Sequence, residues 1–376
     1  MKVLVNAGPW LSVPPPAYGG IENVVATLVP ALRERGVRVV LASVGTSKLE
    51  VDELIVTYDD GQFADLQKPY NQVMGIAHAH LSRVVAELRG RDDIDLVHDH
   101  VEVVGPAVLS AYGGPPVLHT LHWDLHKHPA FYNAFPPSIA VNGVSESQLA
   151  RAPRALRAAA IGAIHLATPL ADRDLRPSRG EHMVVMGRIC GLKGQHVAAR
   201  ICQKLGLPLV LAGPVSGRDT PAELDVVAQD PDHPLHNHPD VRYHLDQVSP
   251  YLDGDLVRWA GTVGGAARDE LYATARAALF PIQWDEPGGT AVVEAMALGV
   301  PPVGLRRGCL PEIIDHGRTG FLADGEEELA EWVLRVDELD PEECRREARR
   351  RFSPSVMAER YLELYEQVAR GHLART

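Results

Sequence analysis

Short apolar runs alternate with longer amphipathic stretches along the first part of the chain. The runs have the length and β-branched content of buried strands, and they are KVLVNA, VRVVLASV, DLVHDH, PPVLHT and AVNGVS. ENVVATLVPALRERG, between the first two runs, has the spacing of a helix that buries one face. Strands that alternate with helices are typical of parallel sheets. The pattern therefore predicts a doubly wound α/β domain.

A second series repeats this alternation after a stretch rich in Ala, Arg and Pro. Its strands are HMVVMG, PLVLAG, LVRWAG, AALFPI and one around Val303. We predict an N-terminal Rossmann-like domain at 1–172, a second at 173–352 and a terminal helix at 353–376 that returns to the first domain. The two domains are expected to face each other across a cleft lined by the carboxyl ends of their strands.

The terminal and connecting segments carry further signals. Ser353 and Pro354 open an amphipathic last helix as N-cap and first helical residue. The connection between the domains is expected around Leu170 to Gly180, where Pro and charged residues gather. The polar stretch 214–255 is predicted to be a long surface excursion.

Composition narrows the classes of partner. The 376 residues suit two domains, and 49 acidic against 37 basic residues give a formal charge of −12, which weighs against nucleic acid. At most a peripheral membrane contact is expected, through Arg151, Arg154 and Arg157 at helical spacing, and a solvated helix face is the favoured alternative. The apolar start is too short for a signal peptide or a membrane span, so a cytoplasmic protein is predicted.

Cysteines and histidines are the residues that could form disulfides or bind a metal. The four cysteines, at 190, 202, 309 and 344, form no CxxC pair and are interpreted as free thiols of a reducing compartment. The histidines gather at 98–100, 119–128 and 233–244, but no HExxH motif or zinc spacing accompanies them. We therefore predict no metal site.

The stretch WDEPGGTAVVEAMALG, residues 284–299, places Glu286 and Glu294 around a glycine pair. AALFPIQ reads as a buried strand, Glu286 follows it in a loop, and Glu294 is expected about two turns into the next helix. Amides at that helix start suit an anion, and Gly288 and Gly289 allow a close approach of the backbone. A carboxylate among apolar residues needs a partner, which is either a sugar hydroxyl or, in the alternative, a buried Arg.

Two further turns follow predicted strands. In MGRICGLKGQ, Arg188 and Lys193 stand at a strand-to-helix turn where two cations can hold a diphosphate, although an exposed basic turn is the alternative. In PPPAYGGIENVV, residues 14–25, Gly19 and Gly20 precede a helix, which is a weak phosphate signal and not GxGxxG. His122 of HTLHWDLH follows a strand and is expected to face the cleft, with a core histidine as the alternative.

These motifs, with VSES and LPEIIDHGRTGFL, occur in the order seen in retaining glycosyltransferases of family 4, which the chain resembles over nearly its whole length. The resemblance implies the GT-B fold and transfer of a sugar from a nucleoside-diphosphate sugar to a hydroxyl of a glycan, glycolipid or small natural product. It implies no cofactor and no metal. The segments EPGGT and GCLPE also resemble those of family members that tailor antibiotics.

The resemblance assigns roles to residues of this chain. Glu294 would hold the ribose hydroxyls, Glu286 the hydroxyls of the donor sugar, and the amides of Gly288, Gly289 and Thr290 would lie against sugar and phosphate. Arg188 and Lys193 would bind the diphosphate, Gly20 would approach it beside Gly19, and His122 would lie beside the transferring sugar. His122, Arg188, Lys193 and Glu286 are thus the expected catalytic residues.

The chain departs from the family pattern at Gly288, where Phe is common, at Thr290, where Leu is common, and in HLATPL at 165–170, where an Asn-Gly turn is usual. These departures leave the donor sugar open. Two other classes also remain open: a GT-B-like sugar-nucleotide epimerase or phosphorylase, and a non-catalytic protein that binds nucleotide sugars. Intact glutamates and cations weigh against the non-catalytic class.

Overall fold

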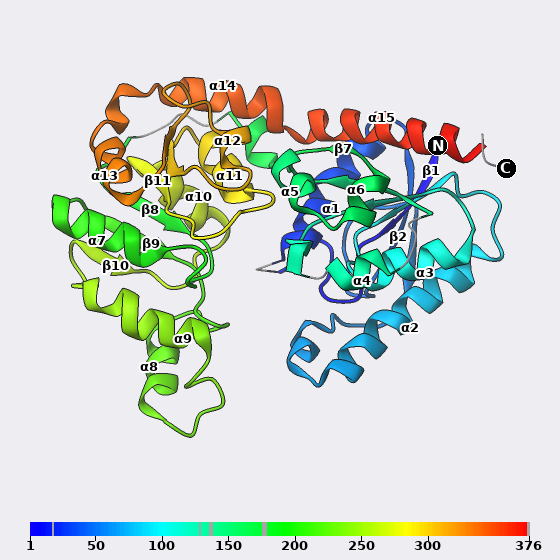
Figure 1. Cartoon of the computed structure of the whole chain (residues 1–376), viewed down its shortest axis with the longest axis horizontal. Coiled ribbons are helices and arrows are strands. Elements are labelled where there is room, and N and C mark those ends of the chain that lie inside the picture. Colours follow the sequence, from blue (N-terminus) through cyan, green and yellow to red (C-terminus); the bar gives the residue numbers. More distant parts are fainter. Residues whose placement is uncertain (17–18, 128, 135–137, 175–178, 374–376) are drawn as a thin grey trace. The chain divides into compact units, whose positions relative to one another are not determined.

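The computed structural model describes residues 1–16, 19–127, 129–134, 138–174 and 179–373. The described part of the chain divides into two compact units. Unit 1 comprises Met1–Pro169 and the C-terminal segment from Pro354, and unit 2 comprises Leu170–Ser353. Each unit is built on its own parallel sheet with helices on both faces (Figure 1).

The sheet of unit 1 is parallel at every described pairing, with the strand order β3-β2-β1-β4-β5-β6-β7. Its strands are β1 (Lys2–Asn6), β2 (Arg38–Ser43), β3 (Glu53–Val56), β4 (Leu96–Asp99), β5 (Val117–Thr120), β6 (Ala140–Gly143) and β7 (Ala160–Ala163). The strand order reverses between β1 and β4. In doubly wound sheets, ligands bind at the carboxyl ends of the strands beside such a reversal.

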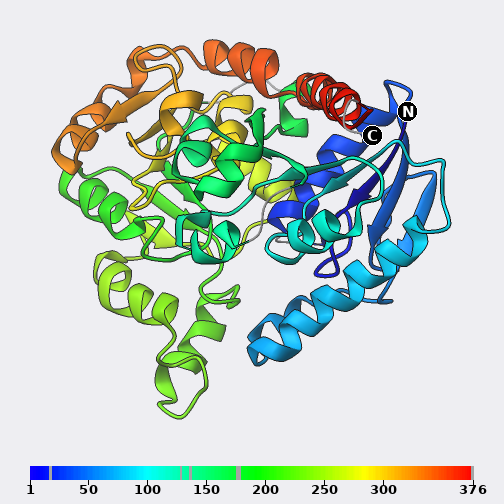
Figure 2. The ribbon, with the colours of Figure 1, turned by 45° about the vertical axis from the view of Figure 1, so that its right-hand side comes forward.

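Alternate residues of these strands face two different helix layers, because side chains alternate across a sheet. Val3 and Val5 pack with α1 (Gly20–Arg33) and α15 (Pro354–Leu373), whereas Leu4 of the same strand packs with α2 (Tyr70–Leu88) and α3 (Val104–Tyr112). Figures 1 and 2 both show α2 and α15 on opposite sides of this sheet. The helices of unit 1 are α1 (Gly20–Arg33), α2 (Tyr70–Leu88), α3 (Val104–Tyr112), α4 (Pro129–Asn133), α5 (Glu146–Arg151), α6 (Arg154–Ala159) and α15 (Pro354–Leu373).

The sheet of unit 2 is also parallel at every described pairing, with the order β10-β9-β8-β11-β12-β13 and a reversal between β8 and β11. Its strands are β8 (Met183–Met186), β9 (Leu209–Ala212), β10 (Val257–Trp259), β11 (Ala277–Phe280), β12 (Pro302–Leu305) and β13 (Phe321–Ala323). Its helices are α7 (Gln195–Leu205), α8 (Pro221–Gln229), α9 (Pro239–Tyr243), α10 (Gly265–Ala273), α11 (Thr290–Ala297), α12 (Leu310–Ile313), α13 (Glu326–Leu334) and α14 (Pro341–Phe352). The prediction of two parallel α/β sheets is confirmed.

The stretch 214–255 is more than a surface excursion, because it contains α8 and α9. Leu224 and Val227 of α8 and Val241 of α9 are buried in the larger core cluster of unit 2. Helix α8 and the loop after it project from the sheet (Figure 1). The excursion is thus a folded extension of the domain, anchored by apolar side chains that its polar composition concealed.

The helical stripe predicted for Arg151, Arg154 and Arg157 is wrong. Helix α5 ends at Arg151 and α6 begins at Arg154, because Pro153 forces the preceding Ala152 into an extended conformation. Arg151 Nη1 lies 3.3 Å from Asp124 Oδ2, and Arg157 Nη1 donates to the Ala150 carbonyl at 3.0 Å. Within the described residues, none of the helices has the length and hydropathy that spanning a bilayer requires.

Candidate active site

The turn between β8 and α7 is clamped onto the segment that follows β11. Gly194 has a φ of +72°, and a Cβ there would lie 2.0 Å from the Pro281 carbonyl oxygen. The Gln283 amide donates to the Leu192 carbonyl at 2.8 Å. Since β8 and β11 flank the reversal in strand order, the clamp lies at the carboxyl ends of the strands beside that reversal.

Lys193 and Glu286 form an ion pair across this clamp. Lys193 Nζ lies 2.6 Å from Glu286 Oε2, and the Trp284 indole Nε1 donates to the same oxygen at 3.0 Å. The Glu286 side chain is 14% exposed, so its carboxylate is largely removed from water and depends on these donors. The structure therefore brings together two of the predicted catalytic residues.

The backbone of Glu286 is fixed by the loop after β12. The Cys309 amide donates to the Glu286 carbonyl at 2.8 Å, and the Gly308 amide donates to Asp285 Oδ1 at 3.2 Å. Gly308 has a φ of +56°, and a Cβ there would lie 2.3 Å from both the nitrogen and the oxygen of Glu286. Only glycine fits this close approach.

Helix α11 begins directly after the glycine pair. Gly289 is its N-cap residue with a φ of +62°, and a Cβ there would lie 2.6 Å from Ile313 Cδ1 and 2.8 Å from Cys309 Sγ. The first amides of a helix have no partner within the helix. The segment from Gly288, which is buried, to Thr290 therefore offers amide donors next to Glu286 in the chain.

Glu294 lies one turn into α11, not two, because the helix begins at Thr290. Its Oε1 is 3.4 Å from Arg268 Nη1 of α10. Burial raises the pKa of Glu294 above its ordinary value, although Arg268 opposes this shift. Glu286 and Glu294 thus have different cationic partners, and their convergence on one ligand stays a prediction.

Arg188 is held by the excursion. Its Nε lies 3.7 Å from Asp240 Oδ2 on α9, and its side chain is half-exposed. The buried Gln195 side chain donates to the Arg188 carbonyl at 2.9 Å, and the Tyr243 hydroxyl accepts from the His196 amide at 3.1 Å. Helix α9 therefore supports the turn that carries both predicted phosphate-binding cations.

In unit 1, Gly19 and Gly20 lie at the start of α1, and Ala17 and Tyr18 of the same motif lie outside the described residues. Among the described residues, none has an atom within 4 Å of a Cβ built on Gly20, whereas one on Gly19 would lie 2.7 Å from the Pro15 ring.

His122 follows β5 and pairs with a second histidine. Its Nε2 lies 2.9 Å from His100 Nδ1, and its amide donates to Glu102 Oε1 at 2.6 Å. Burial lowers the pKa of His122 to about 4, against the opposing effect of Glu102, so the ring is neutral near pH 7. A neutral ring can either donate or accept a hydrogen bond.

Another of the clustered histidines, His98, has a structural role. His98 lies 2.7 Å from both the Tyr365 hydroxyl and Thr120 Oγ1, which ties α15 to the sheet. Among the described residues, no group of three or more His, Cys, Asp or Glu side chains could hold a metal ion. His128 lies outside those residues. The four cysteines are free and buried.

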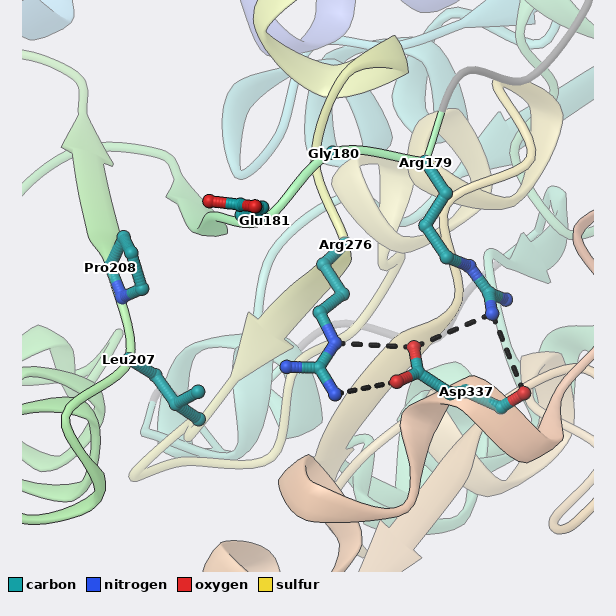
Figure 3. A pocket seen from close by; sticks show the side chains of 7 residues that line it. All are labelled: Arg179, Gly180, Glu181, Leu207, Pro208, Arg276 and Asp337. Carbon is teal, nitrogen blue, oxygen red and sulfur yellow. Dashed lines mark hydrogen bonds and ion pairs between the residues drawn. The ribbon is translucent and has the colours of Figure 1, made fainter.

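A cavity of about 500 Å³ in unit 2 lies elsewhere (Figure 3). Glu181, Pro208 and Arg276, in its lining, precede β8, β9 and β11, so it opens at the amino ends of the strands. Two arginines there point toward Asp337, and Arg276 Nη2 donates to its Oδ2 at 2.6 Å. Lys193 and Glu286 lie at the opposite, carboxyl ends of these strands.

Sequence reasoning missed several partners of the site. Arg268, Asp240 and Glu102 lie 26, 52 and 20 residues from the groups they contact, Glu294, Arg188 and the His122 amide. Trp284 was the partner easiest to predict from the sequence, because it stands two residues before Glu286 in the same motif. Of the other three partners, only Glu102 could have been suspected from the sequence, because it follows the carboxyl end of β4.

Comparison with known proteins gives the family. The family model described as "Glycosyltransferase Family 4" matches residues 18–157, and the model described as "Glycosyl transferases group 1" matches residues 172–354. The D-inositol 3-phosphate glycosyltransferase of Pseudarthrobacter chlorophenolicus is 26% identical over 369 residues, covering 84% of this chain and 80% of that protein.

Solved structures agree with this assignment. AviGT4, a glycosyltransferase involved in avilamycin A biosynthesis, is 27% identical with a TM-score of 0.65 and 98% of each chain covered. HepE of Anabaena, solved with UDP and glucose, is 17% identical with a TM-score of 0.67 over 98% of this chain and 100% of that one, which shows the fold. The chain therefore belongs to the family 4, or group 1, glycosyltransferases of the GT-B fold, enzymes that transfer a sugar from a nucleotide sugar.

Proposed function

We propose that the chain is a retaining, metal-independent glycosyltransferase whose donor diphosphate is bound by Arg188, Lys193 and the first amides of α11. The observation that supports this most is the Lys193–Glu286 pair at the reversal in the sheet of unit 2, next in sequence to the start of α11. Unit 2 is the donor side in this proposal, and unit 1 is the acceptor side.

The leaving group explains the need for these cations. A nucleoside diphosphate departs as an anion, so groups that neutralise developing charge lower the barrier more than a strong acid does. Among the described residues, Lys193 forms its ion pair with Glu286. In this proposal the Glu286 carboxylate passes from the ammonium to a sugar hydroxyl as the phosphate arrives. Both structural donors to Glu286 use Oε2, and we assign the sugar hydroxyls to Oε1.

Glu294 is proposed to accept hydrogen bonds from the ribose hydroxyls. A carboxylate with a raised pKa and one long contact to Arg268 gains most from two hydroxyl donors. In unit 1, the backbone at Gly19 and Gly20 is proposed to approach the diphosphate, and neutral His122 to donate to or accept from a hydroxyl of the transferring sugar.

The acceptor is proposed to be a hydroxyl of a glycan, glycolipid or small natural product. The likeness to AviGT4 at 27% identity supports placing small natural products first. The family assignment favours transfer over the epimerase, phosphorylase and non-catalytic alternatives.

Thermal-shift measurements against UDP-, GDP- and dTDP-sugars, with and without magnesium, test the proposal. A ligand that binds only the native state raises the melting temperature with its affinity. We expect one nucleotide series to stabilise the protein clearly without magnesium, and its sugar donor to release the nucleotide when acceptors are screened. Stabilisation that requires magnesium would contradict the metal-independent site.

A further inference from the structure

Close to His122, the buried His119 lies between two carboxyl groups, those of Asp99 and Glu102. His119 Nδ1 is 2.6 Å from Asp99 Oδ2, and its Nε2 is 3.5 Å from Glu102 Oε2, an ion-pair distance. The side chains of His119 and Asp99 are fully buried, and that of Glu102 is 1% exposed. A histidine between two carboxylates out of contact with water is stabilised in its charged form.

Asp99 is fixed independently of His119. Asn6 of β1 donates from Nδ2 to Asp99 Oδ1 at 2.7 Å, and β4 and β5 place Asp99 directly beside His119 in register. A Cβ on Gly105 would lie 2.1 Å from Asp99 Oδ2, so α3 closes over the carboxyl group. The imidazole of His119 therefore has one orientation available.

Glu102 connects this buried pair to the turn after β5. Its Oε1 accepts from the His122 amide at 2.6 Å and from the Trp123 amide at 3.1 Å. Gln148 closes the turn from the other side, because its Nε2 donates to the Trp123 carbonyl at 2.8 Å. The position of His122 is thus set by a carboxylate that belongs to a different loop.

We propose that His119 and Glu102 are positioning residues for the transfer reaction: the His119 imidazolium, oriented by Asp99, keeps Glu102 ionised, and Glu102 holds the backbone of His122. This inference rests on the proposed function, in which His122 lies beside the transferring sugar. It adds two residues that do not touch substrate but decide where His122 lies.

The charges around His119 agree with this assignment. Burial opposes its charged form, but the contacts with Asp99 and Glu102 raise its pKa to about 9. Burial alone would raise the pKa of Glu102, and His119 reverses that shift, so Glu102 stays ionised. The other titratable groups that face this cluster are His98, His100, His122 and Tyr132. Burial is the main cause of the lowered pKa values of the three histidines, and the positive charge of His119 adds to it.

Nitrogen-15 NMR of the full-length protein labelled at histidine tests the inference without a ligand. We expect the His119 ring, assigned by its loss in His119→Gln, to carry protons on both nitrogens at pH 7 and to titrate near pH 9. In Glu102→Gln the pKa of His122 should fall further below its ordinary value, because the carboxylate that opposes the effect of burial is removed. Val117→Ala, a buried change at the other end of β5, controls for lost packing and should leave that pKa unchanged.

Turnover is measured with the nucleotide sugar that the thermal-shift screen selects. Glu102→Gln and His119→Gln should lower kcat by roughly tenfold or more, as expected when a group at the reacting centre is displaced, with the donor KM little changed. His122→Asn serves as the reference. If it lowers kcat while Glu102→Gln and His119→Gln do not, the positioning role is wrong and the proposed function stands.

Two other results separate the proposals. If His122→Asn leaves kcat unchanged, the assignment of His122 in the proposed function fails, and the NMR measurements still decide whether His119 is charged. A single ring proton on His119 at pH 7 in the wild-type protein overturns the inference, even if the variants do not fold.

Discussion

At the scale of single residues, the two glutamates that frame the glycine pair are held in different ways. Glu286 has a short contact with Lys193 and a donor in Trp284, whereas Glu294 has one long contact with Arg268 and a raised pKa. A well-partnered carboxylate stabilises the fold, and a poorly partnered one has capacity left for a ligand. This difference makes the two residues separable by mutation.

Lys193→Ala should lower kcat by roughly a hundredfold or more, the usual effect of removing a group that stabilises charge in the transition state. The ammonium matters most as the bond to the diphosphate breaks, so the donor KM should change less. Steady-state nucleotide release measures both constants. The exposed Lys204→Ala, at the end of α7, is the matched control and should behave like wild type. Wild-type turnover in Lys193→Ala would contradict the assigned role.

Glu294→Gln should leave the melting temperature unchanged or raise it, while nucleotide binding weakens. The substitution removes a buried charge whose desolvation is only partly offset by Arg268. Removing the carboxylate also removes a strong acceptor for ribose hydroxyls, so we expect a loss of about tenfold in affinity. Calorimetric titration and thermal unfolding measure the two effects. A lowered melting temperature with unchanged affinity would instead support a purely structural Arg268–Glu294 pair.

At the scale of elements, the candidate site of unit 2 is made by loops that touch each other through their backbones. Gly194 packs on Pro281 and Gly308 packs on Glu286, both with positive φ. These contacts fix three loops at the carboxyl edge of β8, β11 and β12. The arrangement is therefore preorganised, which costs the enzyme little reorganisation when the donor binds.

Gly308→Ala tests this preorganisation. A Cβ at 2.3 Å from the Glu286 backbone must displace the loop, so donor affinity should fall by about tenfold or more and stability by on the order of 1–3 kcal/mol. Gly317→Ala is a close control, because Gly317 also has a positive φ of +79° but no atom of the described residues lies within 4 Å of a Cβ built there. Equal losses of donor affinity in the two variants would show that backbone strain alone is responsible.

Asp240→Asn tests the contribution of α9. Asp240 pairs with Arg188 at 3.7 Å and adds a negative charge where a diphosphate is proposed to bind. The Arg188 side of the pair is half-exposed and the contact is long, so the pair contributes under about 1 kcal/mol, and we expect donor affinity to rise by up to roughly fivefold. Titration with the nucleoside diphosphate gives the answer. A marked loss of affinity would mean that Asp240 orients Arg188 for the phosphate.

The sequence predicted the elements whose pattern is local. Strands with runs of Val and Leu, such as β1 and β9, were found, and helix α7 follows the turn of Arg188 and Lys193 as expected. Strand β7 was missed because its sequence is AIGA, and Ala and Gly have low strand propensity. Its place at the edge of the sheet comes from tertiary pairing.

The same limit applies to the site. Lys193 and Glu286 were found because each lies in a compact motif after a strand, and their contact follows from neighbouring strands. Arg268 and Asp240 were not found, because α10 and α9 reach the site only through the packing of the domain. The His119–Glu102 contact was hidden for a further reason: the histidines there were weighed as a metal cluster.

At the scale of the whole molecule, stability should depend on pH through the buried histidines of unit 1. The pKa of His119 is raised to about 9, so its contribution is fully present below the ordinary value of 6.5 and is lost as pH rises through 9. Burial lowers the pKa values of His80 and His122 to about 4. Between pH 6.5 and 4 the unfolded chain therefore binds protons that the folded protein does not, and stability falls as pH falls through this range.

Stability should therefore be greatest near pH 6.5 to 7, between the two limbs set by these pKa values. Denaturant unfolding from pH 5 to 9.5 checks this, and the alkaline limb should be on the order of 2–3 kcal/mol. In His119→Gln the alkaline limb should disappear while the acid limb remains. An alkaline limb of the same size in that variant would assign it to other groups.

The most direct test of the account is a crystal structure of the protein with its nucleoside-diphosphate sugar bound. We predict that the phosphorus atoms lie within reach of the Lys193 ammonium and the Arg188 guanidinium, with phosphate oxygens accepting from the amides at Gly288 to Thr290. A bound donor whose phosphates lie away from both the turn after β8 and the start of α11 would contradict the account.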